Sequence, residues 1–273
     1  MTVNEIRAGH GIPLIGLGTW KLKGAECESI VRMALEMGYR HIDTADVYQN
    51  HVDIARAIRS YARHTLWLTS KIYLNDLQPA RLQETSLRFL QELSTDYLDL
   101  LLIHWPDPNM DLRALVEAMV TVREKGWARH IGISNFSATH YEQLQKWGLL
   151  HEIYNHQLEM HPYLQRRKLY TLSQKAKIQL TAYRPLAKGA FEEDELMQEI
   201  GFRYGKSPSQ IALNWLVAKG VSVIPKASSL AHLRENLESF DFEMTQADFY
   251  QIEKLERAQR FCQPVGLMQF EKE

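Results

Sequence analysis

The chain has 273 residues and a formal net charge of −1, with 45% hydrophobic and 24% charged residues. This composition is ordinary for a globular protein and gives no reason to expect a nucleic-acid or membrane-surface partner. No apolar run reaches the roughly 18 residues of a membrane span, and the first residues lack the pattern of a signal peptide. Cys27 and Cys262 are far apart and have no metal-ligand spacing. We therefore expect a cytoplasmic protein without a metal centre.

Strand-like and helix-like patterns alternate along the chain. The apolar run at 14–18 contains Gly16 and Gly18 and superficially resembles a dinucleotide-binding fingerprint. The third glycine is absent and the next helix begins too late, so we reject a Rossmann domain. After this first run, the pattern predicts strands at 40–42, 65–70, 97–103, 128–133, 153–158, 179–183 and 221–224. It predicts helices at 26–37, 52–62, 79–93, 111–125, 139–147, 167–176, 193–204, 208–219, 230–238 and 245–255.

Eight strands, each followed by helix, indicate parallel strands joined by right-handed crossovers. An open doubly wound sheet can be built from the same units, so periodicity alone leaves two folds. The position of polar residues favours the barrel, because they follow the strands and would line one mouth. These residues are Asp43, Lys71, His104, Asn135, Gln157, Tyr183 and Lys226. We expect a single (βα)8 TIM barrel domain spanning 1–273, with extra terminal helices.

Four of the residues near strand ends suggest a reaction. Asp43 and Tyr48 follow one predicted strand, Lys71 follows the next and His104 the one after. A lysine ammonium beside a phenol lowers the phenol's pKa, so Lys71 would make Tyr48 a general acid near neutral pH. Asp43 would pair with Lys71, and His104 would bind the phenol or a carbonyl oxygen. Such a group protonates an alkoxide formed by hydride addition, and the hydride must come from a nicotinamide.

Each of these residues also has a structural explanation. Asp43 alone would be a loop cap, Lys71 a solvated cation and His104 a satisfied core histidine. The coincidence of all three at successive strand ends favours chemistry over these separate explanations.

Several motifs together resemble the aldo-keto reductases over nearly the whole chain. These motifs lie at 38–48, 71, 102–106, 131–136, 157–163 and 224–226. Within the family, the short loops and the segment 262–267 are most similar to prokaryotic 2,5-diketo-D-gluconate reductases, which also reduce methylglyoxal. The resemblance implies NADPH-dependent reduction of small aldehydes or ketones, such as methylglyoxal and keto sugars.

The resemblance also implies roles for individual residues. Asp43, Tyr48, Lys71 and His104 form a catalytic tetrad in which Tyr48 donates the proton. Further residues would surround the nicotinamide ring and the substrate. Ser134, Asn135 and Gln157 bind the carboxamide, Tyr183 stacks on the ring, and Trp20 and Trp105 form walls of the substrate pocket. For Tyr183 and Trp20, simple packing remains the alternative.

The segment 226–236 resembles the family's adenosine phosphate site, since a cation and a hydroxyl precede a helix N-terminus. The residues concerned are Lys226, Ser228, His232, Glu235 and Asn236. His232 stands where the family usually has an arginine, so we expect a weakened NADPH preference with NADH tolerated. Arg234 is two residues further and would point elsewhere on the helix.

Three further departures from the family affect cofactor contacts. Arg184 stands where a serine is common, and we assign it a contact to a cofactor phosphate. His51 replaces a glutamate and His156 an asparagine.

Two other functions compete with a reductase. One is a catalytically weak, nucleotide-binding regulatory protein on the same fold, which the complete tetrad argues against. The other is an unrelated barrel enzyme such as a phosphate-binding isomerase, which would need a glycine-rich loop where Pro225 and Lys226 stand. We expect a monomer.

Overall fold

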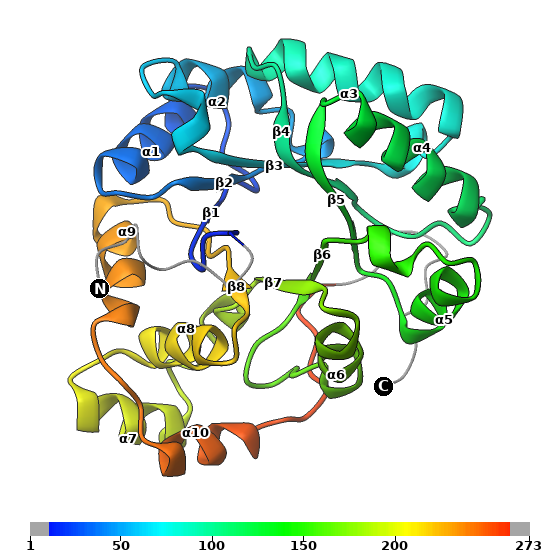
Figure 1. Cartoon of the computed structure of the whole chain (residues 1–273). Coiled ribbons are helices and arrows are strands. Elements are labelled where there is room, and N and C mark those ends of the chain that lie inside the picture. The colour runs from blue at the N-terminus through cyan, green and yellow to red at the C-terminus, as the bar shows by residue number, and fades with distance from the viewer. Residues whose placement is uncertain (1–10, 263–273) are drawn as a thin grey trace.

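The computed structural model describes residues 11–262. Within them, eight parallel strands form one sheet in the order β1 to β8, and helices surround it on the outside (Figure 1). The strands are β1 (Leu17–Gly18), β2 (His41–Asp43), β3 (Trp67–Ile72), β4 (Leu98–Ile103), β5 (Ala128–Ser134), β6 (Asn155–Glu159), β7 (Gln179–Tyr183) and β8 (Ser222–Val223). The predicted (βα)8 barrel is therefore confirmed.

The helices follow the predicted pattern closely. They are α1 (Gly24–Glu36), α2 (His51–Ile58), α3 (Pro79–Leu93), α4 (Leu112–Glu124), α5 (Ala138–Lys146), α6 (Arg167–Ala176), α7 (Glu195–Tyr204), α8 (Pro208–Ala218), α9 (Leu230–Leu237) and α10 (Gln246–Glu253). The last two come after the final strand, as expected for extra terminal helices. None of the helices in 11–262 is long and apolar enough to cross a membrane.

The sheet closes on itself between its first and last strands. Parallel bridges join Ile15 to Val223 and Gly18 to Lys226. Gly18 permits this approach, because a Cβ atom at this position would lie 2.6 Å from the Ile224 carbonyl oxygen. A larger residue would push the two strands apart, so this glycine serves barrel closure rather than phosphate binding.

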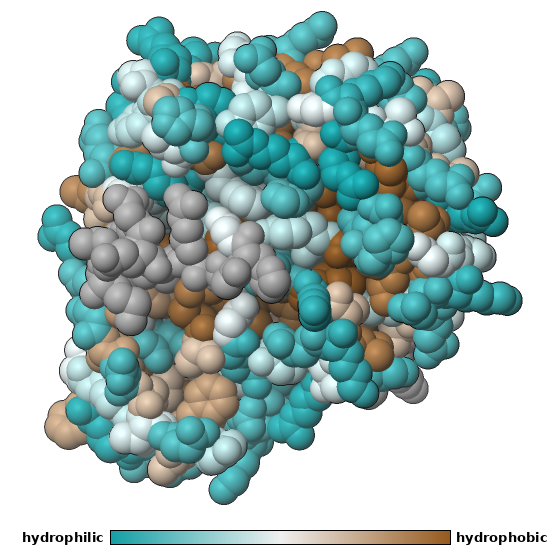
Figure 2. Space-filling view, in the orientation of Figure 1, coloured by the Kyte–Doolittle hydropathy of each residue, from teal (hydrophilic) through white to brown (hydrophobic). Residues whose placement is uncertain are grey.

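Local sequence explains where the helices begin and what they bury. Ser207 caps α8 in a capping box with Gln210, and Pro208 occupies the first turn, where its missing N–H costs nothing. Helix α3 buries Leu82, Phe89 and others on one face, as its apolar period predicts. On the face seen in Figure 2, hydrophilic residues cover most of the rim and hydrophobic residues are visible mainly toward the middle.

Strand register brings the polar residues to one end of the barrel. Asp43 pairs with Gly18 on one side and with Thr69 on the other, and Ser134 pairs with Gln157. Several element boundaries differ from the prediction by a few residues, and one of these differences concerns a site residue. Lys71 lies inside β3 rather than after it, because the strand continues to Ile72. Of the segment 262–267, only Cys262 belongs to the described residues.

Candidate active site

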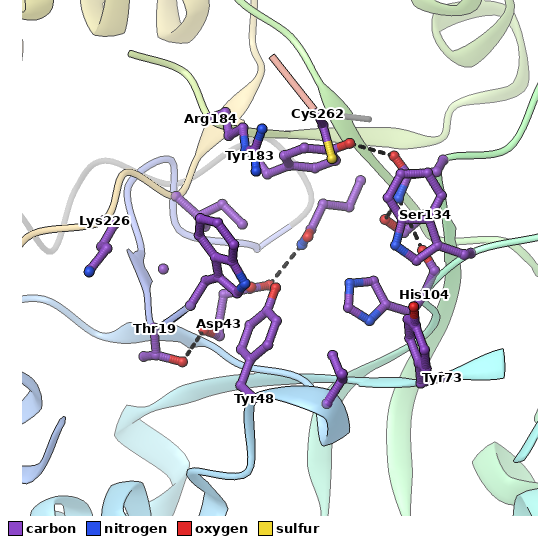
Figure 3. Close-up of a pocket in the computed structure, with 17 residues that line it drawn as sticks. Thr19, Asp43, Tyr48, Tyr73, His104, Ser134, Tyr183, Arg184, Lys226 and Cys262 are labelled. Atoms are coloured by element: carbon purple, nitrogen blue, oxygen red, sulfur yellow. Dashed lines mark hydrogen bonds between the residues drawn. The ribbon is translucent and has the colours of Figure 1, made fainter. Parts of the chain in front are cut away.

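A cavity of about 350 Å³ opens at the mouth formed by the strand ends (Figure 3). The predicted site residues Asp43, Tyr48 and His104 line it, and Lys71 contacts Asp43 directly behind it. Lys226 lies on one side of the cavity, and His104 with Tyr73 lies on the other. The fold thus brings together the four predicted catalytic residues, which come from three separate segments of the sequence.

Asp43 and Lys71 form a buried ion pair. The Lys71 ammonium lies 2.5 Å from Asp43 Oδ1 and donates a second hydrogen bond of 2.8 Å to the Thr44 carbonyl. Gln157 Nε2 donates to Asp43 Oδ2 at 2.7 Å, so both carboxylate oxygens accept hydrogen bonds. Two donors aimed at the two oxygens suit an ionised carboxylate.

Burial and attraction act in opposite directions on this pair. Burial raises the pKa of Asp43 and lowers the pKa of Lys71, while the attraction between the two charges opposes both shifts. The side chains are 2% and 0% exposed, so water screens the pair little. The pair is therefore a fixed internal charge arrangement beside the cavity.

Tyr48 follows β2 on the short 3₁₀ turn Asp46–Tyr48, and its hydroxyl points into the cavity (Figure 3). The Lys71 ammonium lies 5.3 Å from the centre of the Tyr48 ring. Burial raises the pKa of Tyr48 above its usual value, and the Asp43 carboxylate adds to the rise. The predicted net lowering of this pKa is therefore wrong, because desolvation and the Asp43 carboxylate outweigh the attraction of the Lys71 ammonium for the phenolate.

His104 follows β4 and faces the Tyr48 ring edge-on, with 5.9 Å between the ring centres. Burial and the nearby Lys71 ammonium hold the pKa of His104 well below its usual value, so the imidazole is neutral. Among the residues at 11–262, no hydrogen-bond partner reaches its buried Nδ1 atom. Tyr73, which follows β3, packs against the same imidazole at 5.6 Å between ring centres.

The residues expected around a nicotinamide lie on one side of the cavity. Tyr183 donates a hydrogen bond of 2.7 Å to Asn135 Oδ1, and Asn135 Nδ2 donates to Ser134 Oγ and to the His104 carbonyl. Asn135 adopts a left-handed backbone conformation, with φ at 66°, which asparagine tolerates better than most residues. Gln157, predicted in the same role, also holds Asp43 and so belongs to both groups.

The residues expected at the adenosine phosphate are spread over a longer surface. Lys226, Ser228 and His232 are exposed, but of these only Lys226 lines the cavity. Asn236 is buried, and Glu235 accepts a hydrogen bond of 2.6 Å from the Ser207 hydroxyl. The structure thus places these five residues on or just before α9, outside the cavity except for Lys226.

Arg184 does not stand free beside the cavity. Its guanidinium donates to the carbonyl of Phe261, near the end of the described chain, and lies 5.1 Å from the centre of the Trp20 ring. Trp20 and Trp105 both line the cavity, the first 42% exposed and the second 6%.

The two other residues that depart from the family's pattern, His51 and His156, are buried and bind neighbouring side chains and backbone. His51 bridges Glu92 and Ser70 at 2.7 and 2.8 Å. His156 accepts from the Phe136 amide and contacts the Tyr141 hydroxyl.

Sequence reasoning missed several residues that line the cavity, among them Thr19, Val47, Tyr73 and Cys262. Tyr73 could have been found, because it lies two residues after Lys71 at the end of the same strand. Cys262 could not, because it comes from a segment more than a hundred residues beyond His104 with no periodic pattern. In the described part of the chain, no group of three or more His, Cys, Asp or Glu side chains could hold a metal.

A (βα)8 barrel with an ion pair, a phenol and an imidazole at the carboxyl ends of its strands defines an enzyme of the barrel class. The model of the aldo/keto reductase family matches residues 14–257. The chain belongs to this family and is an oxidoreductase of that type. Members of the family generally use NAD(P)H.

Two curated relatives match almost the whole chain. The chain is 38% identical to methylglyoxal reductase DkgA of Yersinia pestis over 260 residues, covering 92% of each. It is 36% identical to methylglyoxal reductase DkgB of Escherichia coli O157:H7, covering 94% of this chain and 97% of the relative.

Solved structures resemble the chain equally closely. The crystal structure of a proposed 2,5-diketo-D-gluconic acid reductase B superposes with a TM-score of 0.90 at 36% identity, covering 95% of this chain and 94% of that one. The aldo-keto reductase MGS-M4, from a Medee basin deep-sea metagenome library, gives 0.89 at 32% identity and covers 96% of both chains.

Proposed function

We propose that the protein reduces small aldehydes or ketones to alcohols with NADPH, and that Tyr48 supplies the proton. The substrates would include methylglyoxal and keto sugars such as 2,5-diketo-gluconate. The observation that carries the proposal is the assembly of Asp43, Tyr48, Lys71 and His104 around one cavity. Its volume of about 350 Å³ lies near the lower end of ligand pockets, which suits a small substrate.

The chain has residues that fit a nicotinamide nucleotide. Ser134 and Asn135 offer a hydroxyl and an amide to a carboxamide, and the Tyr183 ring offers a flat face beside them. Lys226 brings a cation to the opposite side of the cavity, before α9. When bound, the reduced nicotinamide would supply the hydride.

The protein's part of the reaction is proton transfer and charge stabilisation. Tyr48 holds its proton at neutral pH, because a phenol has a pKa of about 10 even in water and burial raises this pKa further. It is therefore a proton donor for a carbonyl oxygen that gains negative charge. The alkoxide is a stronger base than the phenolate, so transfer of the proton from Tyr48 to the alkoxide is favourable in free energy. The phenolate that remains is stabilised by the Lys71 ammonium, which Asp43 and the Thr44 carbonyl hold in place.

The neutral His104 would orient the substrate. Its Nδ1 atom lacks a partner among the described residues, while its ring lies beside Tyr48. A neutral imidazole can donate one hydrogen bond to the carbonyl oxygen without competing with Tyr48 as the acid.

His232 leads us to propose a weak preference for NADPH over NADH. It is exposed on α9, where a bidentate guanidinium would otherwise hold a 2′-phosphate. Arg234 is also exposed on this helix, so it would limit the loss only if it reached the same phosphate.

The test is loss of NADPH absorbance with methylglyoxal and with a keto sugar, repeated with NADH. Turnover supports the reductase, and the ratio of the two cofactors tests the His232 argument. If NADPH binds without any turnover across several small carbonyls, either the proposed substrate class is wrong or the protein is a nucleotide-binding regulator. If NADPH does not bind, the cofactor assignment falls.

A further inference from the structure

The turn Asp46–Tyr48, which carries Tyr48, has little packing behind it. Its three residues keep part of their surface exposed to solvent, and no side chain caps it. Its backbone bonds are Tyr48 N–H to the Ala45 carbonyl and Gln49 N–H to the Asp46 carbonyl, both 3.0 Å. A three-residue turn with so few bonds needs other contacts to hold a catalytic side chain in one place.

A second cavity of about 500 Å³ lies on the other side of this turn. Val47 and Tyr73 line both this cavity and the active-site cavity, and Val47 is 46% exposed. The turn is thus a thin wall with a cavity on each side. The second cavity leaves the turn with little packing on that side, so polar contacts there carry more of its support.

Arg88 of α3 supplies such a contact from within the second cavity. Its guanidinium grips both oxygens of Asp46, the first residue of the turn, at 2.8 and 3.0 Å. This two-pronged geometry fixes direction as well as distance, which a single contact does not. The side chains are 42% and 21% exposed, so the pair contributes little to global stability.

The same network also reaches the strand that carries Lys71. Arg88 bonds Glu92 at 3.2 Å, Glu92 bonds His51 at 2.7 Å, and His51 contacts the Ser70 hydroxyl at 2.8 Å. Ser70 directly precedes Lys71 in β3. One helix therefore ties down both the turn of Tyr48 and the strand of Lys71.

We infer that Arg88 is a positioning residue, which holds Tyr48 at the productive distance from Lys71 and the substrate by gripping Asp46. This inference rests on the proposed function, because it concerns the proton donor of that reaction. Misplacement of a reacting group by about 1 Å can cost up to about 100-fold in rate. A change at Arg88 should therefore affect the chemical step and leave binding intact.

The experiment measures single-turnover oxidation of bound NADPH by methylglyoxal in a stopped-flow instrument. We expect Arg88→Ala to slow this step about 10- to 100-fold. The dissociation constant of NADPH, measured by fluorescence, and the KM for methylglyoxal should stay within about twofold, since Arg88 does not line the active-site cavity. Arg88→Lys keeps the charge but not the two-pronged grip, so it should recover part of the rate.

Two further variants separate positioning from folding. Asp46→Asn should slow the step in the same direction as Arg88→Ala. The double variant should be no slower than Arg88→Ala alone, because that single change already removes the Asp46 contact together with the bond to Glu92. Arg113→Ala is the matched control, since Arg113 pairs with Glu117 at 3.0 Å on the exposed face of α4. It should leave the rate unchanged.

The inference is overturned if Arg88→Ala and Asp46→Asn both react at the wild-type rate. It is equally overturned if the rate falls only in proportion to the fraction of protein that still binds NADPH, which would indicate a folding defect. Failure of the wild-type protein to oxidise NADPH with any carbonyl would instead overturn the proposed function, and this inference with it.

Discussion

Replacing Asp43 by alanine tests the buried ion pair most directly. Among the described residues, the change would leave the Lys71 ammonium, which is 0% exposed, with only the Thr44 carbonyl as a hydrogen-bond partner. It would also remove the acceptor of Gln157 Nε2. Breaking a buried pair by deleting one partner typically costs 3–5 kcal/mol, so we expect the free energy of unfolding to fall by about 3 to 5 kcal/mol.

The assay is reversible unfolding in urea, followed by circular dichroism at constant pH and temperature. Arg113→Ala removes an exposed pair and should cost less than about 1 kcal/mol. Asp43→Asn is nearly isosteric, but it removes the charge and turns one donor toward Lys71 or Gln157. It should therefore destabilise the fold as well.

The double variant Asp43→Asn/Lys71→Met removes both charges. Its loss should be smaller than the sum of the two single losses by about 1 to 3 kcal/mol, because no uncompensated charge remains. If Asp43→Ala costs less than about 1 kcal/mol, water reaches the ammonium and the reasoning from burial is refuted.

Three further predictions follow from the same geometry. Tyr48→Phe should abolish NADPH oxidation and leave the NADPH dissociation constant unchanged; substantial turnover would exclude Tyr48 as the acid. His232→Arg should tighten NADPH binding with little effect on NADH, and an unchanged dissociation constant in fluorescence titration would show that another group holds the phosphate. Burial lowers the pKa of His41 to about 3 and holds those of His104 and His156 well below their usual value. Below about pH 6.5, these histidines bind protons in the unfolded chain but not in the folded protein. The free energy of unfolding, measured with urea, should therefore fall as the pH drops from 6.5 to 5. The slope should reach up to about 1.4 kcal/mol per pH unit for each histidine. A flat profile would mean that these side chains are accessible to protons when folded.

Elements with strong local signals were predictable from sequence. Helix α3 begins at Pro79 and ends at Leu93, as its apolar period and its proline indicate, and β7 also has the predicted bounds. These features depend on neighbours in the chain. The bounds of β3 were less predictable, since nothing between Ser70 and Ile72 interrupts an extended chain and tertiary pairing decides where it ends.

The candidate site was predictable only as a set of residues. Parallel strands bring their carboxyl ends together, so Asp43 and His104 could be placed at one mouth before any coordinates. The pKa direction of Tyr48 could not be predicted, because it depends on how Asp43 compensates Lys71 and how far the cavity excludes water. The contact of Arg184 with Phe261 joins segments far apart in sequence, which no periodic pattern records.

The closure between β1 and β8, which we call the seam, affects where the barrel opens locally in solution. Few backbone hydrogen bonds cross it, among them Gly16 N–H to the Val223 carbonyl and Gly18 N–H to the Pro225 carbonyl. Ile15 and Val223 lie roughly 200 residues apart, so this closure pairs the strand segments of the barrel that are most distant in sequence. Amide hydrogens along the seam should therefore exchange with solvent sooner than those between β4 and β5, whose paired lengths are greater. Lys226 forms a bridge with Gly18 at this closure. A nucleotide bound at Lys226 would therefore be expected to stabilise the contact between the first and last strands.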